Sequence, residues 1–307
     1  MRAKLQEIEA VLRRRVVDGP KHVEPFVRPL DYPDDPGPQG AGYQLIGSAA
    51  VVPIHGTISP RPSVFAGYSG GTSAEQIGRA VDAAAADPKA DAIVLDIDSP
   101  GGAVFGTPEA GAKILAARKV KPVHAVANHM AASGAYWLAT QATTLSVTPA
   151  GWVGSVGVIW PRLDDTKADE QAGLVWHYIT AGEFKADGAG PMTAEESARR
   201  QVIVDEYYRL FGGAVATGRG VPAAKVEKDF GQGDVKLPAD AIASRMADRV
   251  ATLEQVLNEV NGVRTERTKR KVAADLAAKG LPTTVGSPVD MKPYSGITVA
   301  TNNPPTA

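Results

Sequence analysis

The sequence predicts an α/β fold, and two observations lead to this prediction. Apolar, β-rich runs alternate along the chain with segments of helical periodicity, which is typical of strands joined by helical crossovers. Several of the apolar runs are nearly continuous, as expected where both faces of a parallel sheet are covered. With 307 residues, the chain is long enough for one large domain or two smaller ones.

The individual elements follow from this alternation. Strands are expected at 50–58, 91–99, 122–129, 143–149, 156–160 and 175–180. Helices are expected at 73–87 and 107–119, and a further helix is expected to hold Ser133. Helices are also expected at 193–217, 222–229, 238–248 and 252–261. Thr193 and Glu196 have the spacing of a capping box, which marks the start of the long helix.

Composition divides the chain into three parts. Residues 1–42 are expected to form an N-terminal helix and a linker rich in Pro and Gly. Residues 43–262 hold the strand and helix pattern and are expected to form a single folded domain. Residues 263–307 begin basic and end in Pro, Thr and Asn, so we expect a short helix followed by a disordered tail.

Charge and composition exclude several classes of protein. The net charge of −1 gives no overall attraction to nucleic acid. The chain has no cysteine, and no run of about 18 apolar residues that would span a membrane. The N-terminus lacks the apolar centre of a secretory signal, so we expect no membrane anchor and a cytoplasmic protein. No zinc-binding spacing occurs, and neither a metal nor an organic cofactor is expected.

A lone serine stands out in the stretch "HMAASGAYWLA", where small residues surround Ser133. Small neighbours let a substrate approach a hydroxyl, but they also let two helices pack closely. A nucleophilic serine needs a base within hydrogen-bond reach. His124 and His129 lie near Ser133 in sequence, although isolated histidines are more often structural. The stretch is not a G-x-S-x-G elbow, which disfavours an α/β-hydrolase.

A lysine is the other base available to a serine. Burial disfavours the charged ammonium and leaves free amine near neutral pH. Lys185 lies in "ITAGEFKADGAGPMT", a segment rich in Gly and Ala, and fits this requirement. The alternative is an ordinary exposed loop lysine, and the residues alone leave both interpretations open.

A third element is the stretch "DIDSPGGAVFG", in which an expected strand ends at Ser99 and Pro100 before two glycines. Such a turn directs backbone N–H groups toward developing negative charge. The neighbouring "GTPEAGAK" lacks the G-K-[ST] end of a phosphate loop. The glycines of "GWVGSVG" do not match a dinucleotide fingerprint.

Together, "DIDSPGG", "MAASGAYWLA" and the glycine-preceded Lys185 closely resemble the signal peptide peptidase A (SppA) family of serine peptidases. The spacing of Ser133 and Lys185 is similar to that of single-domain members. Further matches are "TPAGWVGSVGVI", "PMTAEES", "GRGVPAAKVEK" and "GDVKLPADAIASRMADRV". The resemblance covers roughly residues 48–260.

The resemblance implies a ClpP/crotonase-like fold, a spiral of ββα units, and a Ser-Lys catalytic dyad of Ser133 and Lys185. It assigns the oxyanion hole to the N–H groups of Gly102 and Gly134, and substrate binding to Gly101 and Ser155. No cofactor or metal is implied. ClpP itself uses a histidine about twenty-five residues after the serine, where this chain reads "VGVIW", so the dyad is favoured over a triad.

The N-terminal region and "DEYYRLFGGAVATGRG" are more similar to the phage and prophage branch of head maturation proteases, of the lambda capsid protein C type. This branch implies capsid, scaffold and portal proteins as substrates or partners, and a homo-oligomeric ring. The alternatives are a soluble bacterial SppA-like peptidase acting on signal or other peptides, a crotonase-type acyl-CoA enzyme, and a non-catalytic capsid-assembly subunit.

Overall fold

A computed structural model describes residues 41–62 and 71–278 of the chain. The expected N-terminal helix and nearly all of the linker, within residues 1–42, lie outside these ranges. The main sheet has the order β1-β2-β5-β6-β7-β10, with β8 and β9 continuing from the far end of β6. Its strands are β1 (Gln44–Ile46), β2 (Ala49–His55), β5 (Ala92–Ser99), β6 (Val123–Ala132), β7 (Thr144–Val147), β8 (Trp152–Gly154), β9 (Val235–Lys236) and β10 (Arg249–Val250).

The pairing of these strands is parallel except for β1 with β2 and β8 with β9. A separate parallel pair is formed by β3 (Ile58–Ser59) and β4 (Thr72–Ser73). The first half of β6 pairs with β7, whereas Met130–Ala132 pair with β8. The register between β5 and β6 also shifts after Ile97. The last residues of β6 therefore leave the line of the main sheet.

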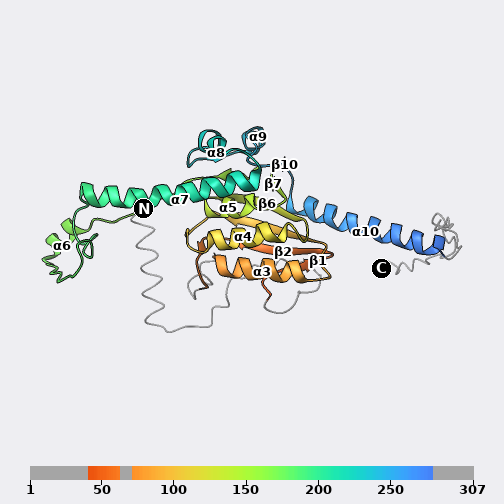
Figure 1. Cartoon of the computed structure of the whole chain (residues 1–307), viewed down its shortest axis with the longest axis horizontal. Helices are drawn as coiled ribbons and strands as arrows, with labels where there is room; N and C mark the ends of the chain where they lie inside the picture. Colours follow the sequence, from red (N-terminus) through yellow and green to blue (C-terminus); the bar gives the residue numbers. More distant parts are fainter. Residues whose placement is uncertain (1–40, 63–70, 279–307) are drawn as a thin grey trace, which may run out of the picture. The chain divides into compact units, whose positions relative to one another are not determined.

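Helices cover both faces of this sheet. They are α3 (Ala74–Ala86), α4 (Thr107–Ala117), α5 (Gly134–Thr140), α6 (Thr166–Ala172), α7 (Ala194–Arg219), α8 (Ala223–Asp229), α9 (Pro238–Ala243) and α10 (Leu253–Ala278). Helices α3, α4, α5 and α7 follow one another across one face (Figure 1). The other face packs Val51, Val94 and Val126 against the first turns of α10. The α/β fold expected from the sequence is confirmed.

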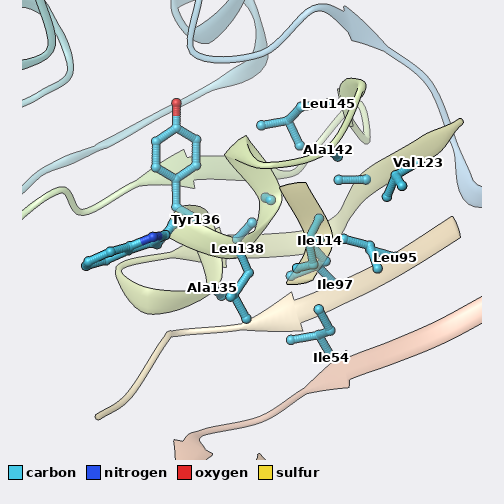
Figure 2. Packing of buried hydrophobic residues seen from close by; sticks show 14 of the residues in the cluster. Ile54, Leu95, Ile97, Ile114, Val123, Ala135, Tyr136, Leu138, Ala142 and Leu145 are labelled. Atoms are coloured by element: carbon cyan, nitrogen blue, oxygen red, sulfur yellow. The ribbon is translucent and has the colours of Figure 1, made fainter. Parts of the chain in front are cut away.

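The larger core lies between the sheet and the helices α3, α4 and α5. Figure 2 shows Ile54, Leu95 and Ile97 of the strands with Ile114 of α4 and Leu138 of α5. These side chains are fully buried, and each contributes about 1.5–3 kcal/mol relative to exposure. The core therefore extends directly beneath the short helix α5.

Helix α5 has only seven residues, and packing rather than intrinsic helix propensity stabilises it. Trp137 stacks on Phe211 of α7, with ring centroids 5.0 Å apart. Gly218 of α7 lies against the backbone of Thr140, so closely that a Cβ there would come within 2.2 Å of its carbonyl oxygen. The buried hydroxyl of Tyr136 donates a hydrogen bond of 2.9 Å to the Met246 carbonyl.

Two of the expected strands were wrong. Residues 156–160 and 175–180 form neither helix nor strand. Val156 still packs in the core, but most of the other large apolar side chains face solvent instead of a sheet, as the exposures of Ile159 (87%), Val175 (77%) and Ile179 (102%) show. Helix α6, which lies between these two runs, was not predicted from the sequence.

Smaller differences have local causes. The expected strand at 50–58 divides into β2 and β3 because Gly56 takes a positive φ of 63° between them. The expected helix at 238–248 ends at Ala243, followed by a turn in which Arg245 has φ 68°.

The final expected helix is longer than predicted, since α10 runs from Leu253 to Ala278. The helical start of the basic segment after residue 262 is thus present, and the remaining tail lies outside the described ranges. None of the helices within 41–62 and 71–278 combines the length and apolar character needed to cross a membrane.

Candidate active site

Ser133 lies at the point where β6 ends and α5 begins. Its backbone has φ 52° and ψ −127°, a conformation that costs a non-glycine residue about 1–3 kcal/mol. Two hydrogen bonds hold it there: its N–H donates to the Gly154 carbonyl (2.8 Å), and its carbonyl accepts from the Trp137 N–H (3.0 Å). The sheet and the buried α5 together fix the strained conformation, with the Ser133 side chain half-buried.

The glycine turn after β5 lies directly beside Ser133. The buried Ser99 hydroxyl donates to the Gly56 carbonyl (2.6 Å) and accepts from the Gly101 N–H (3.1 Å). Ile58 of β3 pairs with the turn on its other side, donating to the Gly101 carbonyl (2.8 Å) and accepting from the Ala103 N–H (2.9 Å). The turn is therefore held from two sides.

Space at Gly101 and Gly102 admits only glycine. A Cβ at Gly101, where φ is 91°, would lie 2.6 Å from the Ser133 Cβ and 2.7 Å from the Gly134 nitrogen. A Cβ at Gly102 would lie 2.0 Å from the Ile58 carbonyl oxygen, and one at Gly134 would lie 3.7 Å from the Gly102 nitrogen. The amides of Gly102 and Gly134 thus lie near each other beside Ser133. Within 41–62 and 71–278, neither has an acceptor.

The Ser133 hydroxyl has no hydrogen-bond partner among the described residues. The histidines considered from the sequence are engaged elsewhere: His124 Nδ1 lies 2.8 Å from the Thr144 hydroxyl, and His129 Nδ1 lies 3.3 Å from Asp98. Burial, and then the charge of Arg249, lower the pKa of His124. The described part of a single chain thus provides a serine and two amides, but no base bonded to that serine.

Lys185 lies in the long segment between β8 and α7, and its side chain is exposed. Its N–H donates to the Gly182 carbonyl (3.2 Å). The residues around it are docked on the first turns of α7 through Arg199, which contacts both Phe184 and Asp187.

The structure does not bring Lys185 next to Ser133. Arg199, where the lysine segment docks, and Phe211, where α5 docks, are separated by about 18 Å of helix at 1.5 Å per residue. Tyr207, which lies between them and nearer to Phe211, packs edge-on against Phe105 from the glycine turn. Figure 1 shows α5 beside the C-terminal half of α7, whereas the segment with α6 leads into the other end of that helix.

Ser155, expected to contact substrate, follows β8 next to Gly154, whose carbonyl accepts from Ser133. It has a positive φ of 54°, and its N–H donates to the Asp234 carbonyl (2.7 Å). Gly101, Gly102, Gly134 and Ser155 therefore all lie around Ser133, and only Lys185 is remote.

Two supporting residues were missed from the sequence. Ser99 orders the glycine turn, and the buried Thr107 donates to the Ala103 carbonyl (2.8 Å) and lies close to Gly134. Isolated hydroxyl residues beside a turn carry no sequence signal, although the position of Ser99 directly before Pro-Gly-Gly could have drawn attention to it. In the described ranges no three His, Asp or Glu side chains are grouped as metal ligands.

A parallel α/β sheet that presents a strained serine beside a rigid glycine turn defines a ClpP-like fold with a serine site at its strand ends. Residues 116–265, which include Ser133 and Lys185, match Peptidase family S49.

The chain is similar to several named proteases and phage head proteins. It is 29% identical to capsid assembly protease C of Escherichia phage lambda over 271 residues, covering 87% of this chain and 61% of that protein. It is 33% identical to head-tail preconnector protein GP5 of Enterobacteria phage P21 over 185 residues, covering 59% of this chain and 37% of that protein. Protease 4 of Salmonella typhi is 28% identical over 215 residues, with 69% and 34% covered. The chain thus spans between one third and three fifths of these relatives.

Proposed function

We propose that this protein is a serine endopeptidase that uses Ser133 as nucleophile and Lys185 as general base. The observation that carries the proposal is the strained Ser133, which lies beside two amides that have no acceptor within the described ranges. The match of residues 116–265 to a peptidase family supports it further.

In the proposed reaction, the neutral amine of Lys185 takes the proton of Ser133, and the serine oxygen attacks the scissile carbonyl. The N–H groups of Gly102 and Gly134 stabilise the oxyanion of the tetrahedral intermediate. The Lys185 ammonium returns the proton to the leaving amine, which departs as the acyl-enzyme forms. Water, deprotonated by Lys185, then hydrolyses the ester and regenerates the Ser133 hydroxyl. Gly101 and Ser155 border the peptide.

We further propose that Lys185 serves the Ser133 of a second copy within a homo-oligomeric ring. Within one chain the lysine segment docks far along α7 from α5. That segment exposes large apolar side chains that a second copy would cover, among them Leu163, Trp176 and Ile179. Covering Lys185 on assembly would also remove water from its ammonium and favour the free amine.

The similarity to capsid assembly protease C and to a head-tail preconnector protein supports a role in phage head maturation. The substrates would then be capsid or scaffold proteins, with a portal protein as a further partner. The similarity to Protease 4 favours, as a second candidate, a peptidase acting on signal or other peptides. A crotonase-type enzyme and a non-catalytic subunit have no comparable support.

Active-site labelling tests the proposal. A fluorophosphonate probe should label the wild-type protein on Ser133, and Ser133→Ala should abolish labelling and casein cleavage without loss of fold. Loss of the nucleophile should reduce the rate by several orders of magnitude. Lys185→Met should be comparably inactive, whereas Lys167→Met, in the exposed α6, should be unaffected. Cleavage by a folded Ser133→Ala protein would contradict the proposal.

A further inference from the structure

One arginine of α7 contacts the chain on both sides of Lys185. The Arg199 guanidinium carbon lies 3.7 Å from the centre of the Phe184 ring, one residue before the lysine. Its Nη2 lies 2.8 Å from Asp187 Oδ2, two residues after the lysine. Its Nη1 lies 2.8 Å from Glu195 Oε1, one turn back on the same helix. Arg199 thus ties the lysine segment to a regular helix.

The segment around Lys185 has few other supports. Gly182 and Gly188 enclose it, both with positive φ (104° and 95°), and its residues are mostly exposed. Beyond it, Arg162 donates to the Gly190 carbonyl and lies 3.8 Å from the buried Glu196. Of the two ion pairs that Arg199 makes, the one with Asp187 is better covered, since the Asp187 side chain is 19% exposed and that of Glu195 is 74% exposed. It therefore keeps more of its strength than a fully solvated pair.

These contacts require the shape of arginine. A guanidinium stacks flat on an aromatic ring and still presents in-plane N–H groups to two carboxylates. The ammonium of a lysine at position 199 could meet only part of this set. Since a general base must arrive within hydrogen-bond reach of the nucleophile, loose tethering of its segment lowers the fraction of productive encounters.

We propose that Arg199 is a positioning residue that clamps Phe184 and Asp187 and so presents Lys185 to Ser133. The inference rests on the proposed function, in which Lys185 is the general base. Arg199 itself touches neither the peptide nor the reacting atoms. Its effect is on how often the lysine amine occupies its working position.

The test compares Arg199→Met with Arg209→Met. Arg209 lies on the same helix in an ion pair of 2.6 Å with Glu206 and does not contact the lysine segment, so it is a matched control. Arg199→Met should lower kcat by about 10–100-fold with little change in KM, because a small misplacement of a catalytic group costs rates of this order. Backbone amides of 184–187 should exchange hydrogen faster, Arg199→Lys should recover only part of kcat, and Arg209→Met should match the wild type.

Changes on the loop side keep the test informative if the helix variant folds poorly. Asp187→Asn and Phe184→Ala leave α7 intact and should each reproduce part of the kcat loss and of the faster exchange. An Arg199→Met protein with wild-type kcat, beside an inactive Lys185→Met protein, would overturn the clamp and leave the proposed function standing. Normal kcat in both loop variants would also overturn it. An active Lys185→Met protein would instead remove the proposed function itself.

Discussion

The turn that carries Ser133 and the segment that carries Lys185 are built in opposite ways. Ser133 lies between a fully buried α5 and two strand ends, and backbone hydrogen bonds fix it and its glycine neighbours. Lys185 lies on an exposed segment held to one helix by side-chain contacts. In the proposed reaction, the turn with Ser133 would supply the nucleophile and the exposed segment would supply the base.

We call the turn with Ser133 the buried half of the site and the segment with Lys185 the exposed half. The largest effect on the buried half is expected from one added methyl group at Gly102. Gly102→Ala would place a Cβ 2.0 Å from the Ile58 carbonyl oxygen and push the turn away from Gly134. We expect loss of the oxyanion site, and a fall in kcat of about 10²–10³-fold.

Gly212→Ala is the matched control for this change. Gly212 lies inside α7 with open space around its Cα, so the substitution should keep activity and stabilise the helix by up to about 1 kcal/mol. Equal kcat for Gly102→Ala and the wild type would show that the turn does not take part in the reaction.

The exposed half is tested by substituting one of its exposed apolar residues with a charged residue. Ile179→Asp should disrupt association between copies, because Ile179 is fully exposed in a single chain and a carboxylate buried in an apolar contact is costly. Light scattering should show smaller species, and specific activity should become dependent on protein concentration in the micromolar range. Glu183→Asp serves as the control, because it keeps the charge of an exposed acidic side chain in the same segment. An Ile179→Asp monomer with full activity would contradict assembly through this segment.

A smaller effect is expected away from the lysine segment, at the ion pair of Arg219, the last residue of α7, with Asp248. Burial raises the pKa of Asp248, but hydrogen bonds from Arg219 and the Leu145 N–H outweigh it, and the pKa lies below its ordinary value. Asp248→Asn should therefore lower the free energy of unfolding at pH 7 by about 2 kcal/mol, allowing for the partial exposure of the carboxylate.

The sign of the pH dependence follows from the lowered pKa. The contribution of Asp248 is present above the unfolded-state pKa of about 3.9 and is lost as the pH falls through the lower folded-state value. Urea unfolding should show the two proteins converging as the pH is taken below about 4. A gap that is unchanged in acid would show that the charge of Asp248 is not the cause.

The secondary structure around Ser133 was predicted better from the sequence than that of the segment around Lys185. Strands and helices around Ser133 have continuous burial, so their apolar periodicity reports their structure directly. The runs at 156–160 and 175–180 have the same apolar character, but most of their large apolar side chains are exposed, and a single-chain pattern cannot distinguish a core strand from an unpaired surface. The glycine cluster around Ser133 was expected, whereas the separation of Lys185 from it depends on the path of α7 and left no local signal.

Subunit complementation tests most directly whether Ser133 and Lys185 of one site come from two neighbouring copies. Ser133→Ala and Lys185→Met proteins, each inactive alone, are co-expressed with different tags, and oligomers that contain both are purified. If neighbouring copies supply the two groups, about a quarter of the sites in a randomly mixed ring would be complete, and casein cleavage should return at about that fraction of the wild-type rate. Purified mixed oligomers that remain inactive would contradict the account, and would require that each chain bring its own Lys185 to its own Ser133.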